Sequence, residues 1–355
     1  MSARPQSARP RRAVVLGGGG VLGFAWMLGA LSAYEDVTGR DLLDTDVVVG
    51  TSAGSVAAAL LGCGYPIPVI RRHHQGVPAP GDPLIDYDYE AGTGGALPPR
   101  PGIRPGAPRL LLDVLRGPKR ISPIVALSGL LPAGRGSLGA VHDLIGQVAG
   151  DAGFATTWPT RPRPWIVAAD YRTGHRVVFG RDEFPHAPVR PIRTATLADA
   201  VTASCSIPAW YPPTVIHGVP YIDGGTASNA SVDVLIGTTV DEVYVFAPMA
   251  SVDVDRGHSP VERIERGVRR AITKGILDDV SRLRAGGMRV HLITPGPADL
   301  AAIGLNLMDP TRRTAVLETA RSTAATQLRR QLRTRSAAAP AQAEADDEIA
   351  DGVAT

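Results

Sequence analysis

Two glycine-rich turns, each between an apolar strand and a helix, constrain the fold of this chain most. The pattern over 13–35 predicts a strand, a turn at Gly17–Gly20 and a helix whose apolar residues recur at helical spacing. The pattern over 46–61 repeats this order around Gly50-Thr51-Ser52-Ala53-Gly54. Strand, helix, strand and helix within about 50 residues predict a parallel α/β sheet.

The first of these units could also be taken for a membrane-spanning or signal segment. Ala13 to Tyr34 is 22 residues without a charge, preceded by Arg11 and Arg12. Its many glycines, however, lower both helix propensity and apolar content. Since a strand, a glycine turn and a helix account for every residue, we predict a buried core unit.

The 355 residues are predicted to form one large domain with two tails. Residues 1–12 are expected to be a disordered basic tail, and 336–355, Ala-rich and then acidic, a disordered acidic tail. The domain then covers 13–335. Within it, the Pro- and Gly-rich stretch 76–135 is predicted to be a lid-like insertion, and 256–335 to supply C-terminal helices.

Regular elements are predicted on both sides of the insertion. Further strands are expected at 165–169, 176–179, 221–223, 242–246 and 289–293, and helices at 142–148, 197–203 and 261–284. The helix over 261–284 would bury a stripe formed by Val261, Ile264, Val268, Ile272 and Ile276.

A final amphipathic helix carries apolar residues every four positions together with seven arginines between 312 and 335. Its apolar stripe consists of Val316, Ala320, Ala324, Leu328 and Leu332. Such a helix either covers the core with its charges in solvent, which we favour, or lies on a membrane surface.

Charge and cysteine content exclude several classes of function. The net charge of +3 argues against a nucleic-acid partner, although a weak basic bias is compatible with peripheral contact to an anionic membrane. Cys63 and Cys205 are far apart and form no metal-binding pair, so we expect two buried thiols in a reducing cytoplasm. No metal-binding cluster is visible in the sequence, and no metal or cofactor is predicted.

The Gly50–Gly54 sequence predicts a nucleophilic serine. Between a strand and a helix, a GxSxG pattern places the serine on a tight elbow with its hydroxyl exposed. A side chain at Gly50 or Gly54 would collide across the turn. The helix N-terminus then directs free N–H groups, including that of Ala53, towards developing negative charge. The alternative is that Ser52 merely caps the helix.

The Gly17–Gly23 segment fits two kinds of site. Gly18, Gly20 and Gly23 match a dinucleotide-binding GxGxxG, for which Asp41 or Asp44 could bind the ribose. The bare N–H groups could instead form an oxyanion hole. The nearby elbow favours the oxyanion hole, because a nucleophile needs one and a dinucleotide site does not need an elbow.

Asp223-Gly224-Gly225 follows a short strand and supplies a candidate base. A serine needs a proton acceptor, and none of the eight histidines lies in a motif that marks it as one. A carboxylate within hydrogen-bonding distance could take the proton directly. Alone, however, this Asp is equally well explained as a turn residue.

Together, in this order, the three motifs resemble those of the patatin-like phospholipase family, over roughly residues 13–250. The stretch Ala203–Pro208, followed by Pro212-Pro213, is also similar. The resemblance implies a three-layer α/β/α sandwich with a mostly parallel sheet, and a serine acyl hydrolase of lipid esters. It implies a Ser52–Asp223 dyad, an acyl-enzyme, and an oxyanion hole from the amides of Gly18, Gly19 and Gly20.

One position departs from the family pattern. The slot before Gly23, usually Arg or Lys, is Leu22 here, which puts rate and phospholipid preference in doubt. Two other functions stay open. One is an α/β-hydrolase with a Ser-His-Asp triad using His258 or His291, although only one strand–helix unit precedes Ser52. The other is a non-catalytic lipid- or nucleotide-binding protein.

Overall fold

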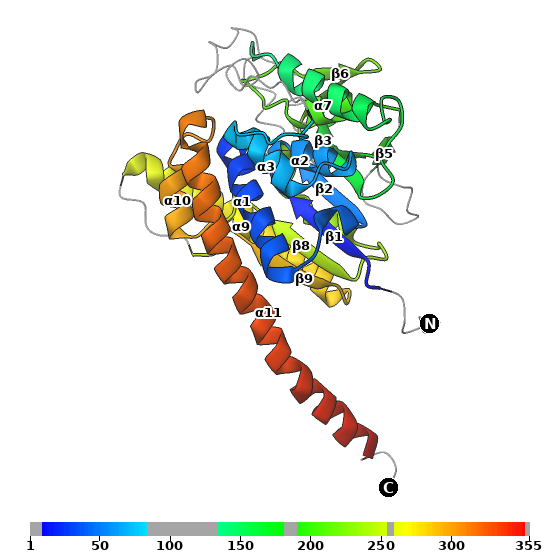
Figure 1. Ribbon diagram of the computed structural model, residues 1–355, viewed down its shortest axis with the longest axis vertical. Coiled ribbons are helices and arrows are strands. Elements are labelled where there is room, and N and C mark those ends of the chain that lie inside the picture. The colour runs from blue at the N-terminus through cyan, green and yellow to red at the C-terminus, as the bar shows by residue number, and fades with distance from the viewer. Residues whose placement is uncertain (1–8, 84–133, 181–189, 193, 254–258, 352–355) are drawn as a thin grey trace, which may run out of the picture.

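A mixed, mostly parallel sheet with helices on both faces forms the protein (Figure 1). The computed structural model describes residues 9–83, 134–180, 190–192, 194–253 and 259–351. Strands β2 and β3 lie to one side of β1, and strands β8 and β9 to its other side, all parallel to it. These strands are β1 (Arg12–Leu16), β2 (Val47–Thr51), β3 (Arg163–Asp170), β8 (Glu242–Phe246) and β9 (Arg289–Ile293).

Shorter strands complete one side of the sheet. Strand β4 (Arg176–Phe179) pairs antiparallel with β3, and β5 (Arg190–Ile192) extends the sheet beyond it. Strand β7 (Val219–Asp223) pairs antiparallel with both β3 and β6 (Thr214–Ile216). The predicted α/β/α fold is therefore confirmed, with antiparallel strands at one side.

Side chains alternate between the two faces of the central strands, as expected for strands buried on both sides. In β1, Val14 and Leu16 belong to one core cluster, whereas Ala13 and Val15 belong to another. Helices α1 (Gly20–Thr38), α2 (Ala53–Gly62), α3 (Ile67–Gln75), α7 (Gly139–Asp151), α8 (Leu197–Ser204) and α11 (Arg313–Asp351) contribute to the first cluster. Helix α9 (Pro260–Ala285) packs in the second, and the short α10 (Pro297–Ile303) joins β9 to α11.

Helix α1 is a core helix, as predicted, since Trp26, Leu28 and Leu31 are fully buried. It crosses α11 closely at Gly29, where an added Cβ would lie 2.2 Å from the Leu317 carbonyl oxygen. Figure 1 shows the two helices side by side. Among the described residues, no helix has the length and apolar content needed to cross a membrane.

Helix α11 differs from its prediction at one end. Its apolar residues Val316, Ala320, Ala324 and Leu328 are buried, so this stripe covers the core and is not free to contact a bilayer. The helix then runs on to Asp351, through residues predicted to be a disordered tail. Alanine has the highest helix propensity, so the Ala-rich stretch extends the helix beyond the body (Figure 1).

Of two further predictions, the one for α9 needs correction and the one for the insertion lies mostly outside the described residues. Helix α9 exists, and the predicted stripe is buried only towards its C-terminal end: Ile276 is 3% exposed and Ile272 packs against the core. Nearer the N-terminus, Ile264 is 71% exposed and Val268 50% exposed, while Arg269 and Thr273 are buried. This part of α9 packs through polar contacts to the loop after β8, which periodicity cannot reveal. Most of the lid-like insertion predicted at 76–135 lies outside the described residues.

Candidate active site

Ser52 occupies the predicted elbow between β2 and α2. Its backbone has φ 54° and ψ −124°, a region that residues with a side chain rarely adopt. The turn depends on its glycines: a Cβ at Gly50 would lie 2.4 Å from the Gly54 carbonyl oxygen. Gly54 is needed for another reason, since its Cβ would lie 2.1 Å from the Leu16 carbonyl oxygen in β1.

Two buried serines hold this strained elbow in place. The Ser52 N–H donates to the Ser204 hydroxyl at 2.8 Å, and that hydroxyl donates to the Val167 carbonyl oxygen at 2.6 Å. The Ser55 N–H and hydroxyl both donate to the Ser52 carbonyl oxygen, at 2.7 and 2.6 Å. Neither serine was assigned a role from the sequence. Ser204 lies in the Ala203–Pro208 stretch noted above. The similarity of that stretch to the family was the signal that could have pointed to this serine.

Strand register brings Asp223 to this elbow. Strand β2 pairs with Arg163–Val167 of β3 and ends opposite Val167. Strand β7 runs the opposite way and ends with Asp223 opposite Ala168, the next residue of β3. Because β4 occupies the other edge of β3 there, β2 and β7 meet end to end on one edge. The two predicted residues, 171 positions apart in sequence, are thus adjacent in space.

The Asp223 carboxyl is buried, with 5% of the residue exposed. Burial raises its pKa to about 6, while hydrogen bonds from the Ser52 hydroxyl and the Gly225 N–H lower it. The Gly225 bond measures 2.7 Å. Gly224 is required for the close approach, because its Cβ would lie 2.4 Å from the Val167 carbonyl oxygen. A carboxylate with a pKa nearer neutrality is a stronger base than an ordinary aspartate.

The glycine loop lies against the serine, since a Cβ on Gly18 would be 3.2 Å from the Ser52 Cβ. Of the three amides expected to bind an oxyanion, that of Gly18 already donates to the Asn229 carbonyl oxygen at 3.0 Å. Gly19 is the N-cap of α1 and Gly20 its first residue, so neither N–H has an acceptor within the helix. The structure thus narrows the candidate donors to Gly19 and Gly20.

The loop after β8 supports the glycine loop from behind. The Pro248 ring lies 2.9 Å from where a Cβ on Gly19 would be. The Pro248 carbonyl oxygen accepts a 2.7 Å hydrogen bond from Arg269, which is 1% exposed and also pairs with Glu265. Leu22, which departs from the family pattern, is fully buried. The cation near the glycine loop is therefore Arg269 of α9, which contacts Pro248 behind the loop, and not a residue at position 22.

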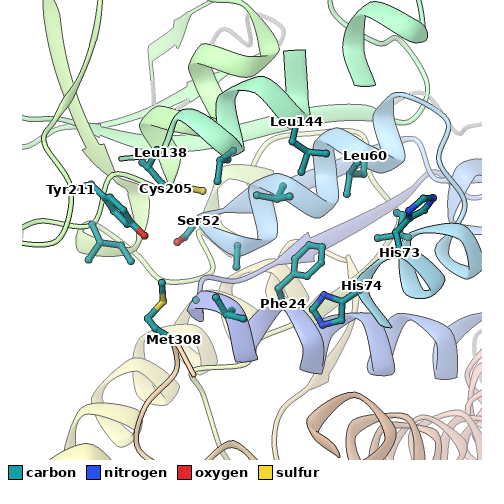
Figure 2. A pocket seen from close by; sticks show the side chains of 17 residues that line it. Phe24, Ser52, Leu60, His73, His74, Leu138, Leu144, Cys205, Tyr211 and Met308 are labelled. Atoms are coloured by element: carbon teal, nitrogen blue, oxygen red, sulfur yellow. The ribbon is translucent and has the colours of Figure 1, made fainter. Parts of the chain in front are cut away.

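A largely apolar pocket opens beside Ser52 (Figure 2). Its volume is about 150 Å³, and an apolar cavity of about this size can bind benzene. Ser52 lies at one end with Tyr211 and Met308, and Gly20 lies against Met308, whose sulfur would be 2.8 Å from a Cβ on that glycine. Apart from Ser52, Tyr211 and two histidines, its lining is apolar or small.

The alternative triad is not assembled by His291. This residue lies in β9, with its Nε2 3.7 Å from a Glu242 oxygen and its ring stacked on Tyr244. Glu242 begins β8, at the end of the strands opposite the elbow. His258, the other candidate, lies outside the described residues. Within the described ranges, no cluster of three or more His, Cys, Asp or Glu side chains is arranged to bind a metal.

Comparison of the sequence with family models agrees with these motifs. The sequence model described as "Patatin-like phospholipase" matches residues 14–74 and 110–236, more than half of the chain. Among curated proteins, none matches by sequence. Two solved structures are similar over 90% of this chain: VipD from Legionella pneumophila (15% identity, TM-score 0.45) and the type III effector protein ExoU (17% identity, TM-score 0.39). The match spans 67% of the VipD chain and 53% of the ExoU chain.

Proposed function

The chain belongs to the patatin-like phospholipase family, and from this premise we propose that it hydrolyses lipid esters through a Ser52–Asp223 dyad. The observation that carries the proposal is the meeting of β2 and β7 on one edge of β3. It brings a strained serine close to a buried carboxyl whose pKa burial raises and the Ser52 hydroxyl lowers. The apolar pocket beside the serine suits the acyl part of such a substrate.

The first half of the reaction forms an acyl-enzyme. The Ser52 Oγ attacks the ester carbonyl carbon while Asp223 accepts the hydroxyl proton. Negative charge develops on the carbonyl oxygen, where the N–H groups of Gly19 and Gly20 stabilise it, joined by the N-terminus of α2 at Ala53. When the tetrahedral intermediate collapses, Asp223 returns the proton to the departing alcohol.

The second half releases the acid. Asp223 removes a proton from a water molecule, and the resulting hydroxide attacks the acyl carbon bound to Ser52. The same amides stabilise the second oxyanion. Collapse breaks the bond to Ser52, whose oxygen takes back the proton, and a fatty acid leaves. Asp223 performs every proton transfer in this scheme, so no histidine is required.

A fluorophosphonate probe tests the nucleophile, because it labels activated serines covalently. The parent protein should be labelled and should hydrolyse members of a panel of esters and phospholipids, whereas Ser52→Ala should do neither. Equal labelling of Ser52→Ala and the parent would refute the assignment. The triad alternative is tested in parallel: loss of activity in His258→Ala or His291→Ala, with fold intact, would require a histidine base.

A further inference from the structure

Asn229 lies between the glycine loop and the turn that follows Asp223. Its carbonyl oxygen accepts the Gly18 N–H at 3.0 Å. Its side chain lies against both segments, since the Nδ2 is 3.3 Å from where a Cβ on Gly18 would be and 3.8 Å from where a Cβ on Gly225 would be. The Gly18 position is itself 3.2 Å from the Ser52 Cβ. Asn229 therefore borders the dyad, although the two-step reaction proposed above gives its side chain no role.

The two polar atoms of this side-chain amide have different surroundings. The Oδ1 lies close to Gly17, is buried, and has no hydrogen-bond partner within the described part of the chain. The Nδ2, in contrast, keeps contact with solvent, because the residue is only half-buried and this atom is not enclosed. A buried oxygen without a partner destabilises a fold. Stability therefore does not explain an asparagine at this position, and its exposed donor needs another explanation.

The Nδ2 and the Asp223 carboxyl lie on two sides of one point. The Asp223 Oδ1 is 3.0 Å, and the Asn229 Nδ2 3.8 Å, from where a Cβ on Gly225 would be. The Oδ1 accepts from the Gly225 N–H, and no hydrogen bond joins it to the Nδ2. One water molecule bonded to two partners spans about 5–6 Å between them, which is within the range that these distances allow.

A water molecule held in this way meets the need of the second half of the reaction. Asp223 accepts one of its protons, and the Nδ2 donates to one of its two lone pairs. The second lone pair is then left for the acyl carbon on Ser52. Two contacts fix the orientation of the water, whereas the carboxyl alone would let it rotate, and orientation of a reactant lowers the barrier to attack.

We propose that Asn229 holds the water that releases the acid, through its side-chain Nδ2. This inference rests on the proposed function, since it assumes an acyl group on Ser52. The water oxygen bonds to the acyl carbon while the proton passes to Asp223. The bond from that carbon to the Ser52 Oγ then breaks, the Oγ takes the proton back from Asp223, and the acid leaves. Asn229 gives up no proton, and it is required for this half of the reaction only.

The test measures the two halves separately with p-nitrophenyl dimethylcarbamate. This reagent transfers its carbamoyl group to an activated serine with release of one p-nitrophenol per active site, and water must then free the serine. In Asn229→Ala, that first release and fluorophosphonate labelling should stay within about twofold of the parent. Recovery of ester hydrolysis after carbamoylation should be about tenfold slower, as expected for the loss of one hydrogen bond. The backbone contact to Gly18 survives the substitution.

Ser228→Ala is the matched control. It removes the acceptor of the Ser231 N–H, at 3.0 Å in the same loop, and keeps the Nδ2, so the ratio of the two rates should not change. Equal slowing of both halves in Asn229→Ala would assign the amide to the oxyanion hole or to the shape of the loop. That result would overturn the inference, and so would an unchanged rate of recovery. Labelling of Ser52→Ala as strong as that of the parent would instead overturn the proposed function.

Discussion

At the scale of single residues, the raised pKa of Asp223 fixes how activity should depend on pH. Only the ionised carboxylate accepts the serine proton, and burial raises its pKa to about 6. We therefore expect kcat/KM for a soluble ester to rise with pH through about 6 and then to level off. The rate of fluorophosphonate labelling should follow the same curve. A midpoint near 4, the ordinary value for aspartate, would show that the carboxyl is not the base.

The same carboxyl should cost the protein stability. Its folded-state pKa lies above the unfolded value of 3.8, so ionisation opposes folding. The penalty appears as pH rises from about 4 and is complete above about 6. A pKa difference of one corresponds to about 1.4 kcal/mol, which makes the penalty about 3 kcal/mol at neutral pH.

Asp223→Asn is thus expected to be inactive yet more stable. It removes the buried charge while its amide oxygen can still accept from Gly225. Its Tm should exceed that of the parent at pH 7.5, and the two should converge near pH 4. Ser52→Ala is the control: it is also inactive, but it keeps the charge and should not gain stability. A lower Tm for Asp223→Asn at pH 7.5 would contradict this account.

At the scale of elements, Ser204 links α8 to the ends of two strands. Its hydroxyl bridges the Ser52 N–H of the elbow and the Val167 carbonyl oxygen of β3. Ser204→Ala would leave both buried groups unpaired, at a cost of about 1–3 kcal/mol, and would release the strained elbow. We expect a lower Tm and a kcat lowered about tenfold or more with a smaller change in KM.

The control for this variant is Ser32→Ala in α1. That buried hydroxyl donates only to the Leu28 carbonyl oxygen of its own helix, at 2.8 Å, so its loss should leave kcat unchanged. Equal effects of the two substitutions on kcat would mean that Ser204 has only a structural part.

The elements that could be predicted from the sequence are those that short-range interactions determine. Strands β1 and β2 and helices α1 and α2 were predicted because apolar runs and glycine turns are local signals. Strand β6, of three residues, and α10, of seven, are too short to show a period. The buried face of the first half of α9 was missed because Arg269 decides it by reaching Pro248, which is a long-range polar contact.

The candidate site divides in the same way. The glycine positions and Ser52 could be predicted, because the turn itself demands those residue types. Asp223 could be identified as the candidate base only because the other two motifs occur in the same chain. That the Gly18 amide is bound to Asn229, and that Ser204 holds the elbow, depends on registers between distant strands. No pattern along the chain encodes those contacts.

At the scale of the whole molecule, a second buried carboxylate lies at the opposite end of the strands and has the opposite pH dependence. Glu242 begins β8, and its oxygens lie 3.3 Å from Arg12, 3.0 Å from Arg40 and 3.7 Å from His291. Despite desolvation by burial, His291, Arg40 and Arg289 hold its pKa at about 2. This one anion at the start of β8 thus contacts the start of β1, strand β9 and the segment after α1.

Because its folded-state pKa is below 4.5, the Glu242 carboxylate contributes stability that is fully present above about pH 5 and is lost as pH falls towards 2. Glu242→Gln leaves Arg12 and Arg40, whose side chains are 17% and 35% exposed, without their counter-charge. Because water still reaches both guanidinium groups, the cost should be about 2 kcal/mol, below the roughly 3–5 kcal/mol of a fully buried pair. At roughly 2–4 °C per kcal/mol, Tm at pH 7 should fall by about 5 °C, and the difference from the parent should shrink below pH 4. Glu318→Gln, on the exposed side of α11, is the matched control and should change Tm little.

Ester hydrolysis per folded molecule should be unaffected by Glu242→Gln, since Glu242 and the elbow lie at opposite ends of the central strands. A loss of activity in fully folded Glu242→Gln would show that the two ends are coupled through the sheet.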